Sequence, residues 1–280
     1  MKTVLVTGAS TGIGEACALW LEKRGYRVFA SVRTMADAEA LQQKSRGALR
    51  PVLLDVTDEA SIREAAQFVG RQAPRLDGLV NNAGIAVAGP LEFVPLGELR
   101  RVLEVNVIGQ VAVTQAFLPL LREARGRVVL MSSISGRVAA PLMGPYAASK
   151  FALEAIGDAL RRELAPWGIE VSIIEPGNIQ TPIWRKGIAW GEALKQQLSP
   201  RAIELYGPAI DGILHYIRGQ DGKGLHPREV ARVVEQALAS ARPKTRYVVG
   251  RDAKAGALLA RLLPDRWVDH FIAGRRFGRQ

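Results

Sequence analysis

The chain has 280 residues, of which 48% are hydrophobic, and it carries a formal net charge of +11 at pH 7. This length allows one sizeable α/β domain, and the single cysteine excludes an internal disulfide framework. No signal peptide and no apolar run of membrane-spanning length is visible, so we expect a cytoplasmic protein.

The positive charge raises the question of nucleic acid or an anionic membrane as a partner. The basic residues are spread along most of the chain, and no basic tract is interleaved with aromatic residues. We therefore expect no nucleic-acid partner and attribute the charge to an anionic small cofactor and an ordinary basic surface.

Apolar, β-branched runs alternate with amphipathic helical segments along the chain. Strands are predicted at 3–7, 27–32, 50–56, 76–83, 126–133, 169–176 and 246–250, and helices at about 12–24, 35–45, 59–73, 96–124 and 145–166. The alternation predicts a doubly wound, seven-stranded parallel sheet with helices on both faces, in a single domain spanning 1–280. Right-handed crossovers place the carboxyl ends of the strands at one edge, where ligands bind.

Two segments depart from this alternation. Residues 183–227 carry short helical stretches and four large aromatic side chains, and we interpret them as a substrate lid over the carboxyl edge. A surface loop with a local apolar cluster is the alternative. Residues 253–280 form an apolar, arginine-containing helical extension that would cap the lid or contact another subunit. Contact with an anionic membrane surface is the less favoured interpretation.

A glycine-rich loop, TGASTGIG at 7–14, joins the first strand to the first helix. Glycine lets the backbone approach a pyrophosphate closely, and the helix amino terminus offers free N–H groups and a positive dipole end. We expect the loop to bind a dinucleotide through Gly8, Ser10, Thr11, Gly12, Ile13 and Gly14.

The end of the second strand bears on which dinucleotide is bound. Val32 stands where an acid would hold the ribose 2′-hydroxyl of NAD, and Arg33 follows it. A guanidinium can pair with the 2′-phosphate of NADP, so NADP(H) is favoured over NAD(H). The alternative is that Arg33 is a solvated loop charge.

The next two strand ends supply further cofactor contacts. Asp55 can accept a hydrogen bond from the adenine amino group, and Val56 can add backbone contacts. Asp58 is predicted to cap the following helix. The NNAG motif allows a close approach to a ribose through Asn82, Ala83 and Gly84.

Tyr146 and Lys150 lie four residues apart on a predicted helix and therefore share one face. A nearby ammonium favours the phenolate, and such a tyrosine can exchange a proton with an alcohol oxygen. Ser133 at the fifth strand end can hold that oxygen, and Asn106 can open its helix locally and bind a water. Each feature alone has a structural alternative, such as a surface pair or a stray polar residue.

Together with EPGNIQT at 175–181, these motifs resemble the short-chain dehydrogenase/reductase family over residues 3 to 182. The resemblance implies a Rossmann-like fold and a catalytic set of Asn106, Ser133, Tyr146 and Lys150, with Tyr146 and Lys150 also at the cofactor. Lys150 would hold the nicotinamide ribose and lower the pKa of Tyr146. The nicotinamide end would be held by Pro176, Gly177, Ile179 and Thr181.

VFASVRT, PYAASKFALEA and VSIIEPGNIQTPIW also resemble the hydroxysteroid/retinol dehydrogenase-like branch. That implies oxidation or reduction of a bulky lipophilic alcohol or carbonyl, with no metal and in a homodimer or homotetramer. We expect Val138, Ala139, Leu142, Met143, Trp184, Ile188, Trp190 and Tyr206 to line the substrate site. A small polar substrate, or a non-catalytic NADP(H)-binding sensor, remains an alternative.

Overall fold

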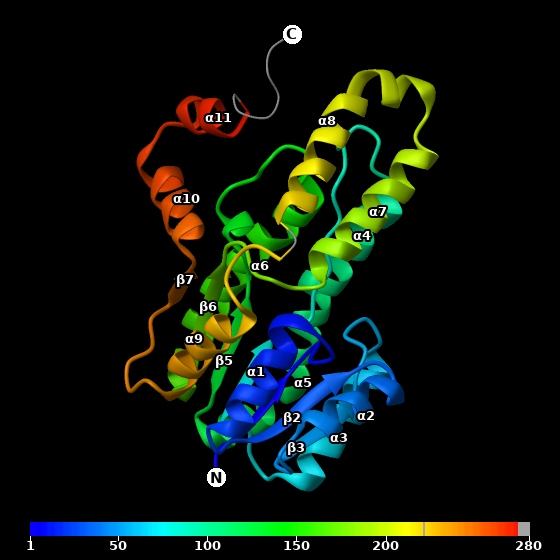
Figure 1. Ribbon diagram of the computed structural model, residues 1–280. Coiled ribbons are helices and arrows are strands. Elements are labelled where there is room, and N and C mark those ends of the chain that lie inside the picture. The colour runs from blue at the N-terminus through cyan, green and yellow to red at the C-terminus, as the bar shows by residue number, and fades with distance from the viewer. Residues whose placement is uncertain (221, 274–280) are drawn as a thin grey trace.

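The computed structural model describes residues 1–220 and 222–273. Its centre is a parallel sheet with the strand order β3-β2-β1-β4-β5-β6-β7, which confirms the predicted fold class (Figure 1). The strands are Thr3–Val6 (β1), Arg27–Val32 (β2), Leu49–Leu53 (β3), Gly78–Asn81 (β4), Arg127–Met131 (β5), Glu170–Pro176 (β6) and Arg246–Val249 (β7). Successive strands are added toward one side of the sheet from β1 to β3 and toward the other side from β4 to β7. This switch between β1 and β4 leaves a crevice at the carboxyl edge.

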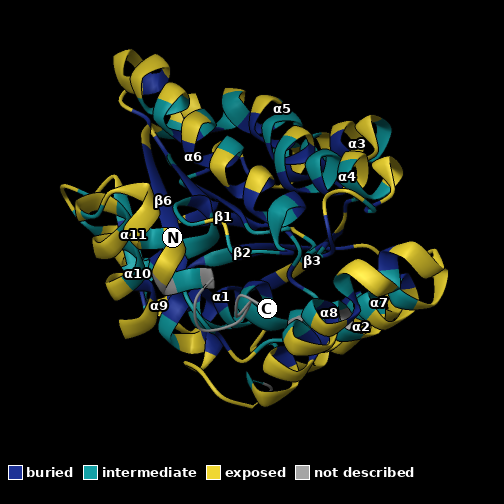
Figure 2. Cartoon of the chain, turned by 90° about the horizontal axis from the view of Figure 1, so that it is seen from above, coloured by how far each residue is buried: buried dark blue, intermediate teal, exposed yellow. Residues whose placement is uncertain are grey.

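Helices cover both faces of the sheet, as the view from above shows (Figure 2). One face carries α1 (Gly12–Lys23), α2 (Met35–Lys44) and α9 (Pro227–Ala239); the other carries α3 (Glu59–Gln72), α5 (Gly109–Ala124) and α6 (Gly144–Leu164). Each layer has its own apolar cluster against the sheet. Cys17 is fully buried in the first cluster, where burial raises the pKa of its thiol to about 12, so it is a core side chain.

The predicted helix at 96–124 has an irregular middle. It consists of α4 (Leu96–Leu103), a π-helical turn (Glu104–Ile108) and α5. This stretch is long and apolar enough to cross a membrane by length and composition alone. Val113, Phe117 and Leu121 are nevertheless fully buried against the sheet, so in this fold it serves as a core helix.

The segment at 183–227 differs from its prediction of short helical stretches. It contains two long helices, α7 (Ile183–Gln197) and α8 (Pro200–Gln220), which stand beyond the carboxyl edge in Figure 1. The two ends of this segment are joined at its base. Leu225 N–H donates to the carbonyl of Asn178 at 3.0 Å, and Gln180 N–H donates to the carbonyl of Leu225 at 3.0 Å.

The C-terminal extension begins with α10 (Arg251–Leu262) and continues with α11 (Asp265–Ala273). Asp252 accepts a 2.7 Å hydrogen bond from the N–H of Asn178, and α10 packs beside the short 3-10 helix Ile134–Gly136. The start of the extension is therefore bound to the loop from which the 183–227 segment begins, and to the 3-10 helix. Arg275, Arg276 and Arg279 lie outside the described residues.

Candidate active site

The glycine loop lies tightly between the first and fourth strands. A Cβ at Gly14 would lie 2.2 Å from the carbonyl oxygen of Gly8 and 2.4 Å from Asn82 Nδ2. Gly8 and Gly12 both have φ of +63°, a conformation that favours glycine. All three glycines are thus required by conformation or by space.

The backbone N–H groups at the start of α1 are available to bind a phosphate. Thr11 occupies the N-cap position but makes no side-chain capping hydrogen bond, so it does not satisfy the first-turn amides. Ile13 and the half-exposed Ser10 lie beside it in the same loop. Such a helix start suits an anion. The cradle therefore fits a dinucleotide pyrophosphate.

The NNAG motif is bound directly to the glycine loop. Asn82 Nδ2 donates to the carbonyls of Thr7 at 2.9 Å and Gly8 at 3.2 Å. The Thr7 hydroxyl accepts from the N–H groups of Asn82 at 2.9 Å and Ala83 at 3.0 Å. These hydrogen bonds fix the glycine loop and the NNAG loop to each other at the switch point.

Arg33, Asp55 and Val56 are the residues expected at the adenine end of the cofactor. Arg33 is exposed directly after β2. Burial opposes ionisation of Asp55, but the hydrogen bonds from Thr57 and the charge of Arg33 lower its pKa. The Asp55 carboxylate accepts hydrogen bonds from the N–H of Thr57 at 2.9 Å and its hydroxyl at 2.7 Å. Asp58 caps α3 as predicted. The side chain of Val56 is buried in the core, which leaves its backbone for contact.

The loop after β6 carries the residues expected to hold the nicotinamide end of the cofactor. The N–H of Gly177 donates to the carbonyl of Val249 at 2.9 Å, and Ile179 is buried and pairs with Leu225. A Cβ at Gly12 would lie 3.4 Å from the side chain of Thr181. Thr181 therefore lies over the glycine loop, and Pro176 ends the strand that carries this segment.

Ser133, Tyr146 and Lys150 converge at the carboxyl end of β5. The Ser133 hydroxyl lies near enough to the Tyr146 phenol to lower its pKa. Lys150 Nζ lies 5.7 Å from the centre of the Tyr146 ring and donates a 2.8 Å hydrogen bond to the carbonyl of Met131. A phenol, a hydroxyl and an ammonium thus share one small volume beside the switch point.

Burial changes the proton affinities of this group. It lowers the pKa of Lys150 from 10.5 to about 8, because an ammonium loses its hydration there. Burial also raises the pKa of Tyr146 above 10, and the Ser133 hydroxyl opposes that rise. The resemblance implied that Lys150 lowers the pKa of Tyr146. In the structure, burial instead raises this pKa.

Asn106 lies in the π-helical turn and is fully buried. Its side chain binds both backbone groups of Ile85: Oδ1 accepts at 2.8 Å and Nδ2 donates at 2.9 Å. Nδ2 also donates to Ser149 Oγ at 2.9 Å, and that hydroxyl donates to the carbonyl of Tyr146 at 2.7 Å. Asn106 therefore links the loop after β4 to the helix that carries Tyr146.

Gly84 leaves the space in which these groups meet. A Cβ there would lie 3.2 Å from Asn106 Oδ1 and 3.7 Å from Lys150 Nζ. The roles of Met131 and Ser149 were not predicted. Met131 acts through its carbonyl group, which every residue has, and a buried helix serine gives no signal in a single sequence.

The residues expected to line a substrate site have mixed positions. Trp190 packs with Val87, Val94 and Val102, and its indole N–H donates to Glu98 Oε2 at 3.1 Å. Tyr206 packs with Ile210 and Leu214 of α8 and with Leu142 of the loop before α6. Half-exposed positions are taken by Val138, Met143 and Ile188, and Ala139 is exposed. The side chain of Trp184 lies outside the described part of the chain.

Within the described residues, no group of three or more histidine, cysteine, aspartate and glutamate side chains is arranged to hold a metal ion.

The comparisons with known proteins agree with this geometry. Residues 2–191 match the family model described as short chain dehydrogenase. The chain is 41% identical over 279 residues to "Retinol dehydrogenase 5" of Mus musculus, covering 95% of this chain and 86% of that protein. It is 39% identical over 279 residues to "NADPH-dependent 3-dehydrocapnine reductase" of Ornithobacterium rhinotracheale, covering 96% of this chain and 95% of that protein.

Among solved structures, a short-chain dehydrogenase from Streptomyces avermitilis matches with a TM-score of 0.77 and 29% identity, covering 98% of this chain and 96% of that one. The chain therefore belongs to the short-chain dehydrogenase/reductase family, in its retinol and hydroxysteroid dehydrogenase-like branch, and is an NAD(P)-dependent oxidoreductase acting on CH–OH groups.

Proposed function

We propose that this protein is an NADP(H)-dependent oxidoreductase that transfers a hydride between the nicotinamide and an alcohol or carbonyl carbon of a bulky lipophilic substrate. The observation that carries the proposal is the convergence of three groups: the Ser133 hydroxyl acts on the Tyr146 phenol, and Lys150 Nζ lies 5.7 Å from the centre of the Tyr146 ring. This group lies at the sheet edge that the glycine loop also occupies.

In this proposal Tyr146 is the acid or base. During carbonyl reduction its hydroxyl gives a proton to the oxygen that becomes the alcohol, and during oxidation it takes that proton back. Ser133 orients the substrate oxygen, and Asn106 supports a water in the proton relay. Bound NADP(H) supplies or accepts the hydride. The positive charges of Lys150 and of the oxidised ring oppose the rise in the Tyr146 pKa that burial causes.

The cofactor would lie along the carboxyl edge. Gly8, Ser10, Thr11, Gly12, Ile13 and Gly14 would hold the pyrophosphate, Asp55 and Val56 the adenine, and Asn82, Ala83 and Gly84 the ribose. Lys150 would hold the nicotinamide ribose, and Pro176, Gly177, Ile179 and Thr181 would hold the carboxamide. The absence of space for a Cβ at Gly14 supports this assignment.

The preference for NADP(H) is supported by the position of Arg33. Arg33 is exposed directly after β2, and its charge acts on Asp55 of the neighbouring strand end. A fork of N–H donors suits a phosphate. The relative from Ornithobacterium rhinotracheale, named as NADPH-dependent, adds support from a chain of similar length.

The lipophilic substrate is supported by the relatives named as retinol dehydrogenases and by the apolar clusters at the 183–227 segment. In this proposal that segment is a lid, and its helices α7 and α8 cover the substrate. A specific observation favours the smaller alternative: Trp190 and Tyr206 are already used for packing within and beneath the lid. A small polar ketone or alcohol is therefore the second candidate.

We further propose a homodimer or homotetramer in the cytoplasm, built on the outer faces of α5 and α6. The support is an exposed stripe on α6 that includes Phe151, Ala155 and Ala159. The C-terminal extension would contact the lid base or a second subunit. Light scattering of the purified protein and fractionation of cells test these two statements.

A panel of retinoids, steroids and small ketones, each followed by NADPH absorbance with NADH in parallel, tests the function. Turnover of the large apolar members with NADPH is the expected result. Turnover of the small polar members alone would overturn the substrate class. Binding of NADPH without turnover of any member would favour a sensor.

A further inference from the structure

The face of α6 that carries Tyr146 continues in a line of polar residues. Lys150, Glu154 and Asp158 follow Tyr146 at steps of four, so the side chains lie one turn apart along the helix. Glu154 is 8% exposed and Lys150 is 4% exposed. A carboxylate is thus buried one turn beyond the ammonium of the active site.

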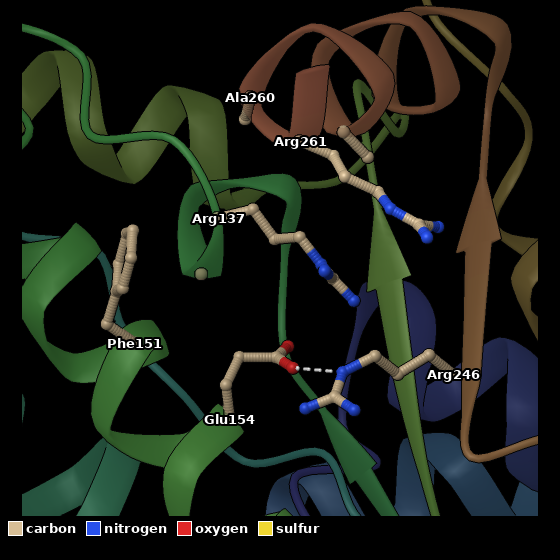
Figure 3. A pocket seen from close by; sticks show the side chains of 8 residues that line it. Arg137, Phe151, Glu154, Arg246, Ala260 and Arg261 are labelled. Atoms are coloured by element: carbon tan, nitrogen blue, oxygen red, sulfur yellow. Dashed lines mark hydrogen bonds and ion pairs between the residues drawn. The ribbon is translucent and has the colours of Figure 1, made fainter. Parts of the chain in front are cut away.

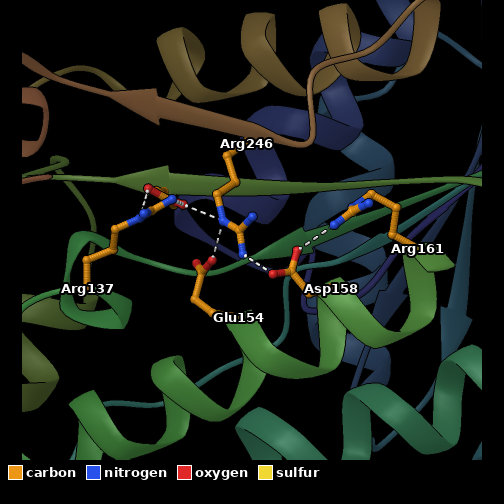
Figure 4. A network of polar contacts seen from close by, with 6 residues as sticks. Arg137, Glu154, Asp158, Arg161 and Arg246 are labelled. Atoms are coloured by element: carbon orange, nitrogen blue, oxygen red, sulfur yellow. Dashed lines mark hydrogen bonds and ion pairs between the residues drawn. The ribbon is translucent and has the colours of Figure 1, made fainter. Parts of the chain in front are cut away.

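The negative charge of Glu154 is only partly compensated. Its Oε2 accepts a 2.9 Å hydrogen bond from Arg246 Nε, whereas its buried Oε1 has no hydrogen-bond partner within 3.5 Å among the described residues. The nearby Ser132 hydroxyl is the other polar group that favours the ionised form of Glu154. Arg246 is shared with two other carboxylates: Nη2 lies 3.0 Å from Asp158 and Nε lies 3.4 Å from Glu175 (Figure 4). One guanidinium therefore faces three carboxylates.

The other charged groups around Glu154 have partners of their own. Glu175 of β6 is fully buried and accepts two hydrogen bonds from Arg137, at 2.8 and 2.9 Å. Asp158 pairs with Arg161 at 3.1 Å as well as with Arg246. Lys150 lies one helical turn from Glu154 toward Tyr146, and the negative charge of Glu154 favours the charged form of Lys150, against the larger effect of burial.

Glu154 also lines a pocket of about 300 Å³, together with Arg137, Phe151, Arg246 and Arg261 (Figure 3). Neither Ser133 nor Tyr146 lines this pocket. Burial raises the pKa of Glu154, and the Ser132 hydroxyl and Arg246 oppose that rise by favouring the ionised carboxylate.

We propose that Glu154 is a positioning residue of the active site: its carboxylate stabilises the ammonium of Lys150 from one helical turn away and so keeps the Tyr146–Lys150 pair in its protonated, working state. This inference rests on the function proposed above, in which Tyr146 exchanges the proton.

The sign of the effect follows from electrostatics. A nearby negative charge favours the protonated forms of both Lys150 and Tyr146, so its removal lowers the pKa values of the pair. Glu154→Gln should therefore move the titration of Lys150 down by about 0.5 to 1 pH unit. In the pH–rate profile of alcohol oxidation, the low-pH limb should also move to lower pH, with little change in KM.

The direct test is an NMR titration of labelled lysine side chains, in which Lys150 is assigned by its loss in a Lys150→Arg variant. The wild-type signal should titrate near pH 8 and the Glu154→Gln signal at lower pH. Glu154→Asp, which keeps the charge, should restore most of the wild-type midpoint. Asp158→Asn is the matched control, because it also removes a carboxylate from Arg246 but lies two turns from Lys150.

An unchanged or raised Lys150 midpoint in Glu154→Gln would overturn the inference, and so would an equal shift in Asp158→Asn. If Glu154→Gln does not fold, Glu154→Met removes the same charge while Arg246 keeps its contacts with Asp158 and Glu175, and the midpoint should again fall. The NMR readout needs no substrate. A failure of the proposed function, such as full activity in Tyr146→Phe, is thereby distinguished from a failure of this inference.

Discussion

The ammonium of Lys150 donates a 2.8 Å hydrogen bond to the carbonyl oxygen of Met131, the last residue of β5. This contact joins the catalytic face of α6 to the carboxyl edge of the sheet. It also fixes a cation in a place where it has lost nearly all of its water, since Lys150 is 4% exposed.

The burial of Lys150 predicts a specific pH dependence of stability. Its pKa is about 8 in the folded chain, against an ordinary value of 10.5, so the unfolded chain binds this proton more tightly between those two pH values. The cost of burying the charge is present below pH 8 and disappears as the pH rises toward 10.5, worth up to about 3 kcal/mol. Relative to Lys150→Met, the wild type should gain stability over this window in urea unfolding. A constant difference between the two proteins from pH 7 to pH 10 would contradict the assigned pKa.

Gly14 and Gly70 form a matched pair for testing the glycine loop. A Cβ at Gly14 meets the backbone oxygen of Gly8 at 2.2 Å, which cannot move aside as a flexible side chain would, whereas a Cβ at Gly70 in α3 meets nothing within 4 Å. Gly14→Ala should cost about 1–3 kcal/mol of unfolding free energy and weaken NADPH binding. Gly70→Ala should stabilise by about 0.5–1 kcal/mol and leave binding unchanged. Equal effects of the two changes would show that the loop tolerates side chains.

Arg33 should decide the cofactor preference. Arg33→Ala removes the guanidinium expected to pair with the 2′-phosphate, so NADPH should bind at least about tenfold more weakly while NADH binding changes little. Fluorescence titration with both nucleotides measures the ratio. Arg50 lies exposed on β3 and serves as a control for a general loss of positive charge. A ratio that stays constant in Arg33→Ala would assign the phosphate to other residues.

The sheet and most of its helices could be predicted from the sequence because their signals are local. All seven strands lie where the apolar runs placed them, and TGASTGIG and NNAG come together because both follow strands at the switch point. Tyr146 and Lys150 could be paired from helical spacing alone. These are properties of consecutive residues.

Other features depend on distant residues and could not be predicted. The contact of Glu154 with Arg246 joins residues 92 positions apart, and Asn106 binds the backbone of Ile85, which no side-chain pattern marks. The π-helical turn was foreseen only as a local opening at Asn106. The long helices α7 and α8 were underestimated, because their glycines and prolines, such as Pro208, suggest breaks that tertiary packing overrides.

Replacing Tyr146 by Phe tests the central claim most directly, because it removes one hydroxyl and keeps the ring that Lys150 underlies. With a substrate from the panel, turnover should fall by at least about 10²-fold while NADPH affinity is retained, since the phenol would act on the proton and the cofactor would be held by the glycine loop. Full turnover by the Tyr146→Phe variant would contradict the account.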